Sequence, residues 1–75
     1  MTPLENEIRD AIREANVLLH TYALDAVTTS RVTKQLQTLA DKAGAAGYEF
    51  SEHFLQQTAD KLERRLLALG RMANA

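Results

Sequence analysis

The chain has two histidines, His20 and His53, as its candidate metal ligands or proton-transfer groups. A metal site needs several such ligands at short, defined spacings. The two histidines fall on different predicted helices, and no aspartate or glutamate lies at a spacing that would complete a site with either of them. We therefore predict that both are surface or helix-capping residues and that the protein binds no metal or other cofactor.

Acidic and hydroxyl side chains offer no stronger candidate for catalysis. Asp25 and Asp60, with Glu63, would have to act as an acid pair, but in a chain with 10 acidic residues a solvated face is the simpler interpretation. Ser30 and Ser51 precede predicted helices and belong to no nucleophile motif, so we interpret them as N-caps. The chain also lacks cysteine and a glycine-rich phosphate loop. We predict that it is not an enzyme.

The basic residues of the last predicted helix suggest a different chemistry. Lys61, Arg64 and Arg65 could line the recognition helix of a small DNA-binding fold, with Arg71 nearby. The same helix carries Glu52, Asp60 and Glu63, and the chain has a net charge of −1. Arginines near a helix C-terminus are also favourable there without any ligand. DNA binding is therefore the weakest of the functions that we consider.

Length and composition define what kind of domain must position these residues. Seventy-five residues form one small domain with a thin core, and zero cysteines exclude disulfides as its support. A partner chain is therefore a plausible way to complete the fold. Hydrophobic residues make up 45% of the chain, which argues against disorder. The acidic N-terminus lacks the pattern of a signal peptide, and no apolar run is long enough to span a membrane, so we expect a cytoplasmic protein without membrane insertion.

The last third of the chain carries an unbroken apolar heptad repeat. Its members follow one another at alternating spacings of four and three residues, which is typical of a helix that lies along another helix. This pattern predicts a helix at about residues 51–72, with Ser51 as N-cap and Phe50 packed on Leu55 as a hydrophobic staple. The repeat consists of Leu55, Ala59, Leu62, Leu66, Leu69 and Ala73.

Two more helices are predicted before it. Thr2, Pro3 and Glu5 have the residue types of an N-cap, N1 and N3, and helical periodicity follows to about residue 24. A second helix at about 30–43 would end at Gly44 in the left-handed conformation. The β-branched run at 27–29 predicts a kink or short loop near residues 25–29, although one continuous helix from residue 3 to 43 is an alternative. The fold class is therefore all-α: an antiparallel helical hairpin, or three helices if the break is real.

The apolar side chains exceed what such a hairpin can bury. Leu66 and Leu67 are adjacent, so they point about 100° apart on a helix, and one packed stripe cannot cover both. Phe54, Leu55 and Tyr22 add to the excess. A small protein with this surplus either self-associates or offers the surface to a partner. The resulting candidate partner-binding residues are Tyr22, Phe54, Leu55, Ala59, Leu62, Leu66, Leu67 and Leu69.

Both ends of the chain resemble a known family. The start Met1-Thr2-x-Leu4-Glu5 and the stretch Phe54-Leu55-Gln56-Gln57-x-Ala59-x-x-Leu62-Glu63-x-x-Leu66-x-x-Leu69 are similar to the small co-chaperones of the type III secretion needle subunit, the YscE/PscE/AscE type. The segment between them, roughly Arg9 to Tyr48, does not match and is several residues longer than in that family.

The resemblance implies a specific role. Proteins of this family are helical hairpins without enzymatic activity that bind a TPR-like chaperone, and the pair keeps the needle subunit unpolymerised in the bacterial cytoplasm before export. It implies that Phe54, Leu55, Ala59, Leu62, Leu66 and Leu69 are core and partner-facing positions. We therefore expect a bacterial, cytoplasmic co-chaperone that acts in virulence-related protein transport. The alternative is a self-associating, dimeric helical protein with a structural or regulatory role.

Overall fold

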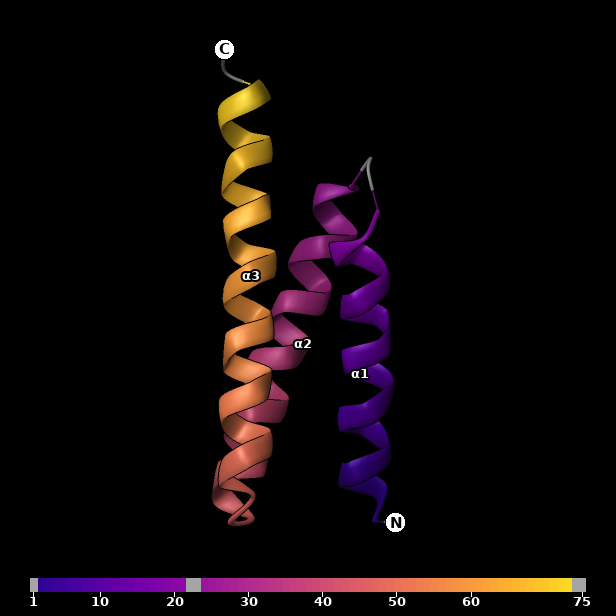
Figure 1. The fold of residues 1–75 in the computed structure, drawn as a ribbon, viewed down its shortest axis with the longest axis vertical. Helices are drawn as coiled ribbons and strands as arrows, with labels where there is room; N and C mark the ends of the chain where they lie inside the picture. The colour runs from indigo at the N-terminus through magenta and orange to yellow at the C-terminus, as the bar shows by residue number, and fades with distance from the viewer. Residues whose placement is uncertain (1, 22–23, 74–75) are drawn as a thin grey trace.

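The computed structural model describes residues 2–21 and 24–73, with side chains placed up to Gly70. It contains three α-helices: α1 (Pro3–Leu19), α2 (Ala26–Ala45) and α3 (Glu49–Ala73). The described residues contain no strand, so the all-α class is confirmed and the three-helix version of the prediction holds. The helices run alternately up and down and form a body of 44 × 17 × 16 Å (Figure 1).

Helix α1 starts as predicted and ends earlier than predicted. The Thr2 hydroxyl accepts a hydrogen bond from the Glu5 amide at 3.2 Å, and Pro3 occupies the first turn. The predicted end at residue 24 is wrong, because the helix stops at Leu19. Side chains that follow the helix bond back to its last turn: the Thr21 hydroxyl donates to the Val17 carbonyl at 2.6 Å, and His20 Nδ1 lies 2.8 Å from the Asn16 carbonyl oxygen. Such bonds satisfy carbonyls that the helix itself leaves without a partner.

Helix α2 begins four residues before its predicted start. Asp25, and not Ser30, is its N-cap, with the carboxylate accepting from the Val27 and Thr28 amides. The β-branched run that suggested a kink at residues 25–29 lies inside the first turns of the helix. Thr29 is fully buried there, and its hydroxyl donates to the Asp25 carbonyl at 2.8 Å, so its burial leaves no polar group unsatisfied. The break lies before Asp25, which rules out one continuous helix.

The turn between α2 and α3 uses a different glycine from the one expected. Helix α2 continues through Gly44, and Gly47 is the residue with positive φ, at 84°. The Tyr48 amide bonds to the Ala43 carbonyl at 2.8 Å and the Gly47 amide to the Gly44 carbonyl at 3.1 Å, which together define a Schellman motif. Gly44 has another role: a side-chain carbon there would collide with the carboxylate of Glu52 on α3.

Helix α3 starts at Glu49, two residues before the expected start at residue 51. The Tyr48 carbonyl accepts from the Glu52 amide at 2.9 Å, which places Ser51 within the first turn instead of at the N-cap. The predicted staple between Phe50 and Leu55 does not form, because Leu55 is buried while 85% of Phe50 is exposed. The sequence pattern thus located the helix correctly and misplaced its first turn.

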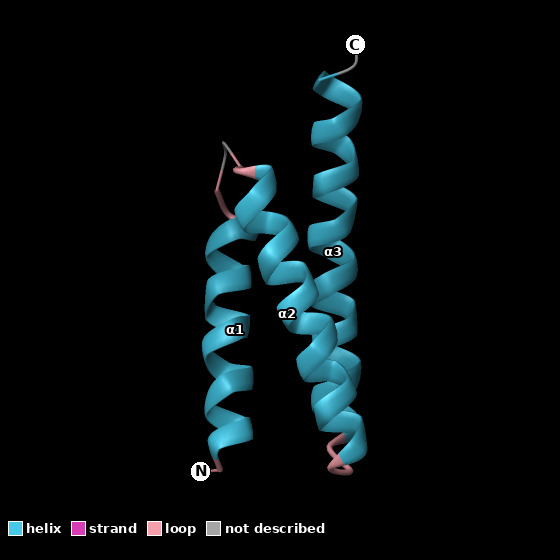
Figure 2. Cartoon of the chain, turned by 180° about the vertical axis from the view of Figure 1, so that it is seen from behind, coloured by secondary structure: helices cyan, strands magenta, loops and turns pink. Residues whose placement is uncertain are grey.

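The core lies mainly between α2 and α3, the pair of helices with the most extensive packing. Helix α1 covers one side of this pair (Figure 2), and two of its three core residues, Ala11 and Ala15, are small. Small residues on all three helices allow the close approach of the backbones. The buried hydrophobic residues are Ile8, Ala11, Ala15, Val32, Leu36, Leu39, Ala40, Ala43, Leu55, Ala59 and Leu62.

Helix α3 is longer than its neighbours and projects beyond them. In both views its last turns extend past the start of α2 and the end of α1 (Figures 1 and 2). Twenty-five residues form a helix of about 37 Å at 1.5 Å per residue, against about 30 Å for the 20 residues of α2. The heptad repeat continues into this projecting part, where no other helix covers all of it.

Candidate protein-interaction surface

The predicted partner-binding residues divide into two groups. Leu55, Ala59 and Leu62 are at most 2% exposed, so in this fold they form the core of the chain and are not accessible to another protein. Leu66 and Leu69 are half-buried, and Leu67 is 60% exposed. Phe54 is 42% exposed and lies near the opposite end of α3. Tyr22 lies outside the described residues.

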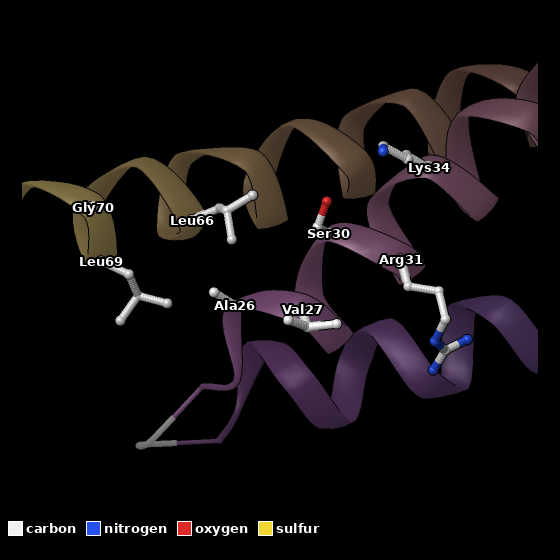
Figure 3. Close-up of a pocket in the computed structure, with 8 residues that line it drawn as sticks. All are labelled: Ala26, Val27, Ser30, Arg31, Lys34, Leu66, Leu69 and Gly70. Atoms are coloured by element: carbon white, nitrogen blue, oxygen red, sulfur yellow. The ribbon is translucent and has the colours of Figure 1, made fainter.

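Leu66 and Leu69 line an open groove between the projecting part of α3 and the start of α2. The groove has a volume of about 800 Å³. Figure 3 shows both leucines pointing from α3 toward the start of α2, where Ala26 lies nearest to them. Val27 also lines the groove. We call this surface the open-end groove, and its lining residues are Ala26, Val27, Ser30, Arg31, Lys34, Leu66, Leu69 and Gly70.

Small side chains and the position of the Asp25 cap explain the groove. Because α2 starts at Ala26, no earlier turn of that helix can cover Leu69. Ala26 and Ser30 are too small to fill the space, and Gly70 adds no side chain from α3. Farther down the hairpin, larger residues of α2 take the place of Ala26 and Ser30, and there the core is closed. The groove is therefore a consequence of where α2 begins.

The rim of the groove is positively charged on the α2 side. Arg31 Nη2 lies 2.6 Å from Glu14 Oε1 of α1, an exposed ion pair that contributes little stability. Lys34 is exposed and forms no ion pair with any residue that the structure describes. No carboxylate lines the groove among the described residues. The site therefore offers an apolar floor with one unpaired cation at its edge.

Arg65, which precedes the groove residue Leu66, joins α3 to the end of α1. Its Nη1 donates to the carbonyls of Leu18 and Leu19 at 2.9 and 2.6 Å, and its Nη2 donates to the Thr21 carbonyl at 2.9 Å. A cation is favourable at the negative C-terminal end of a helix. This use of Arg65 separates it from Arg64, which is exposed, so the two arginines do not form a shared basic patch.

The other residues considered for chemistry lie apart from one another. His20 caps the end of α1, and His53 lies 3.0 Å from the Gln57 amide nitrogen on the same helix. Among the described residues no three histidine, cysteine or acidic side chains are grouped closely enough to hold a metal ion. Asp60 and Glu63 are exposed. Hydrogen bonds from the Thr28 hydroxyl and the Thr28 and Val27 amides lower the pKa of Asp25, which is the expected effect of an N-cap position.

Two exposed apolar residues near helix starts were missed by the sequence analysis. Val27 was interpreted only as a helix-weakening residue, yet it is exposed and lines the open-end groove. Phe50 was assigned to a staple and is instead exposed. In both cases the residue type gave no signal of exposure, because large apolar side chains are usually buried and their coverage depends on the neighbouring helices.

No protein-family model, no curated protein and no solved structure matches this chain. Within the part of the chain that the structure describes, none of the helices is both long and apolar enough to cross a membrane.

Proposed function

We propose that this protein is a non-catalytic adaptor that binds a larger helical protein through the open-end groove and the exposed Leu67 beside it. The observation that carries this proposal is that the heptad repeat continues beyond the helix that covers its first half. Leu66 and Leu69 remain half-buried and Val27 and Leu67 exposed, at the end of the molecule where α3 projects. An exposed apolar surface of this kind on a small protein marks an interaction site.

The geometry suits a partner that presents a helix. A helix laid into the groove would pack against α2 and α3 and extend the three-helix arrangement by one member. The partner's side chains would cover Leu66 and Leu69 as knobs between the turns of α3, in the same way that α2 covers Leu55 and Leu62. Binding would thus complete a core that the isolated chain leaves open at one end.

Within this class we favour a co-chaperone of the type III secretion needle subunit, acting in the bacterial cytoplasm with a TPR-like chaperone. The support is the similarity of the stretch from Phe54 to Leu69, which contains both the buried and the exposed halves of the heptad repeat. A TPR-like chaperone is built of stacked helices and presents helical grooves to such a chain. The needle subunit polymerises through amphipathic helices, and a co-chaperone complex would keep that surface covered.

Co-expression with a TPR-like needle chaperone tests the proposal. We expect the two chains to co-elute from size exclusion, and Leu67→Asp to abolish co-elution because it introduces a charge into the contact. Val17→Asp is the matched control, since Val17 is 66% exposed and Leu67 60%, and Val17 lies on α1 away from the groove. Both variants should keep the helical circular dichroism of the parent.

Two results would contradict the proposal. The first is co-elution that survives Leu67→Asp and Leu69→Asp together. The second is a mass from light scattering that rises with concentration to a dimer, in the chain alone, and returns to the monomer in Leu67→Asp. That result would assign the groove to self-association, the alternative function.

A further inference from the structure

A second apolar surface lies at the other end of the molecule, between α1 and α3. Ile12 of α1 and Phe50, Ser51 and Phe54 of α3 line a shallow hollow there. An adjoining hollow on the same side is lined by Glu5, Ile8, Arg9, Ile12, Arg13 and Ser51. We call the two together the aromatic face. It shares no residue with the open-end groove.

Uneven packing of the three helices leaves this face open. Helices α1 and α3 pack against each other less than either packs against α2, so the side of the molecule opposite α2 is incompletely filled. Phe50 and Phe54 are the two phenylalanines of the chain, and they are 85% and 42% exposed. They lie four residues apart and therefore on one side of α3. A protein of this size that keeps both phenylalanines out of its core has an aromatic contact surface.

Positive charge surrounds the aromatic face on both helices. Arg9 and Arg13 line it from α1. On α3, Lys61 lies seven residues after Phe54 and four before Arg65, whose guanidinium reaches the end of α1. Helical geometry thus places the exposed Lys61 on the α1-facing side of α3 as well.

Three carboxylates of the same two helices point elsewhere. Glu14 pairs with Arg31 of α2, and Glu7 lies two turns before Glu14 on that side of α1. Glu52 lies against Gly44 of α2. Glu5 is the one carboxylate among the described residues that line the aromatic face, and the Thr2 hydroxyl donates to it at 3.2 Å. The face is therefore basic although the chain as a whole carries a net charge of −1.

We propose that the aromatic face binds an acidic amphipathic helix of a second protein. The apolar stripe of that helix would cover Ile12, Phe50 and Phe54, and its flanking carboxylates would meet Arg13 and Lys61. Such complementarity of charge around an apolar contact gives orientation and specificity. The other apolar surface of this chain, the open-end groove, is lined by Arg31 and Lys34 and by no described carboxylate. A second copy would therefore bring positive charge to the basic face, and a different protein fits it better. This proposal is independent of the function proposed above, because it concerns the aromatic face and not the open-end groove.

Two synthetic helical peptides of about 18 residues, roughly five turns, probe this surface directly. One carries leucine on one side and glutamate on the flanks, and the other is identical except for lysine in place of glutamate. Binding of each labelled peptide to the full chain is measured by fluorescence anisotropy. We expect the glutamate peptide to bind at least about tenfold more tightly than the lysine peptide and to weaken as salt is added.

Variants of the chain locate the binding. Phe54→Ala and Lys61→Glu should each weaken the glutamate peptide about tenfold, as expected for an aromatic anchor and a charge partner. Phe50→Ala should also weaken it and carries no risk to folding, since the ring is almost fully exposed. Leu67→Ala is the matched control on another face of α3 and should bind like the parent.

Several outcomes would overturn the proposal. They are no measurable binding, equal binding of both peptides, and parent-like binding by Phe50→Ala and Lys61→Glu. Loss of binding in Leu67→Ala with retention in Phe54→Ala would move the contact to the open-end groove. A dimer of the parent chain that Phe50→Ala converts to a monomer would replace the acidic helix by a second copy. Tighter binding of a DNA duplex than of the glutamate peptide, lost in Lys61→Glu, would make the partner a nucleic acid.

Discussion

The lower and upper halves of α3 carry the same heptad repeat and have different environments. In the lower half Leu55, Ala59 and Leu62 face α2 and are buried. In the upper half Leu66 and Leu69 line a groove that no side chain of the described residues fills. The repeat itself does not change between the two halves. The difference teaches that the burial of a periodic stripe depends on the length of the helices beside it, so one pattern can serve as core and as contact surface.

The most severe test of this comparison is to place a charge in each half. Leu62→Asp should unfold the chain, because an unpaired carboxylate would enter a fully buried position and cost more than about 4 kcal/mol. Leu69→Asp, at a half-buried position of the same repeat, should lower the free energy of unfolding by no more than about 1 kcal/mol. Thermal unfolding followed by circular dichroism measures both. Equal destabilisation by the two substitutions would refute the division of α3 into a core half and a surface half.

Arg65 lies at the boundary between the two halves of α3. Its removal tests how much its contact with α1 contributes to the stability of the fold. Arg65→Ala should lower the free energy of unfolding by about 1.5–3 kcal/mol, since the carbonyls of Leu18, Leu19 and Thr21 lose a charged donor. Arg64→Ala, one residue earlier and exposed, should be nearly silent. Urea unfolding of the two variants gives the comparison. A silent Arg65→Ala would mean that α1 is held to α3 by apolar packing alone.

Glycine substitutions compare the closed end of the hairpin with the projecting part of α3, and we expect them to change stability less than the substitutions above. Gly47→Ala should destabilise the chain by about 1 kcal/mol, because its φ of 84° at the closed end of the hairpin disfavours a side chain. Gly70→Ala in the projecting part of α3 meets no atom, so better helix propensity should stabilise that helix by up to about 1 kcal/mol. Melting temperatures of both variants would show opposite signs. A loss of stability in Gly70→Ala would indicate that something already occupies the open end.

The smallest expected effect concerns Asp25. As the N-cap it sets the start of α2, and therefore the point from which α2 covers α3. Its folded-state pKa lies below the ordinary value of 3.8, so the contribution of the cap is fully present above that value and is lost as the pH falls through the lowered pKa. The unfolded chain binds more protons in this window, and stability therefore rises with pH there. We expect Asp25→Asn to flatten the dependence of melting temperature on pH between about 2 and 5. An unchanged slope in Asp25→Asn would assign that dependence to other carboxylates.

The sequence was a good guide to the helices and a poor one to their ends. Thr2 and Pro3 correctly marked the start of α1, and the heptad repeat correctly marked α3 as a packed helix. Asp25 was not identified as a cap, because the β-branched residues after it suggested a break. Those residues are tolerated since the Thr28 hydroxyl donates to the Asp25 carboxylate and the Thr29 hydroxyl donates to the Asp25 carbonyl. Gly44 was interpreted as a helix end, although its lack of a side chain makes room for Glu52.

The candidate surfaces depended on information that no single helix contains. The periodicity of α3 identified Leu66, Leu67 and Leu69 but treated them like Leu55 and Leu62, since coverage is decided by the start of α2. Phe50 and Phe54 became a surface because α1 and α3 pack loosely against each other, which is a property of three helices together. Partner binding by these residues stays a prediction.

The Arg65 contact also bears on how the molecule opens. Helices α2 and α3 form a closely packed hairpin joined by a short turn, whereas α1 packs less extensively and is tied at its C-terminal end by a single guanidinium. In amide hydrogen exchange such a molecule should behave as two units, with α1 exchanging through a lower-energy opening than the hairpin. A ligand seated on α3 beside Arg65 would then slow exchange in α1, and protection far from the contact would report that binding has taken place.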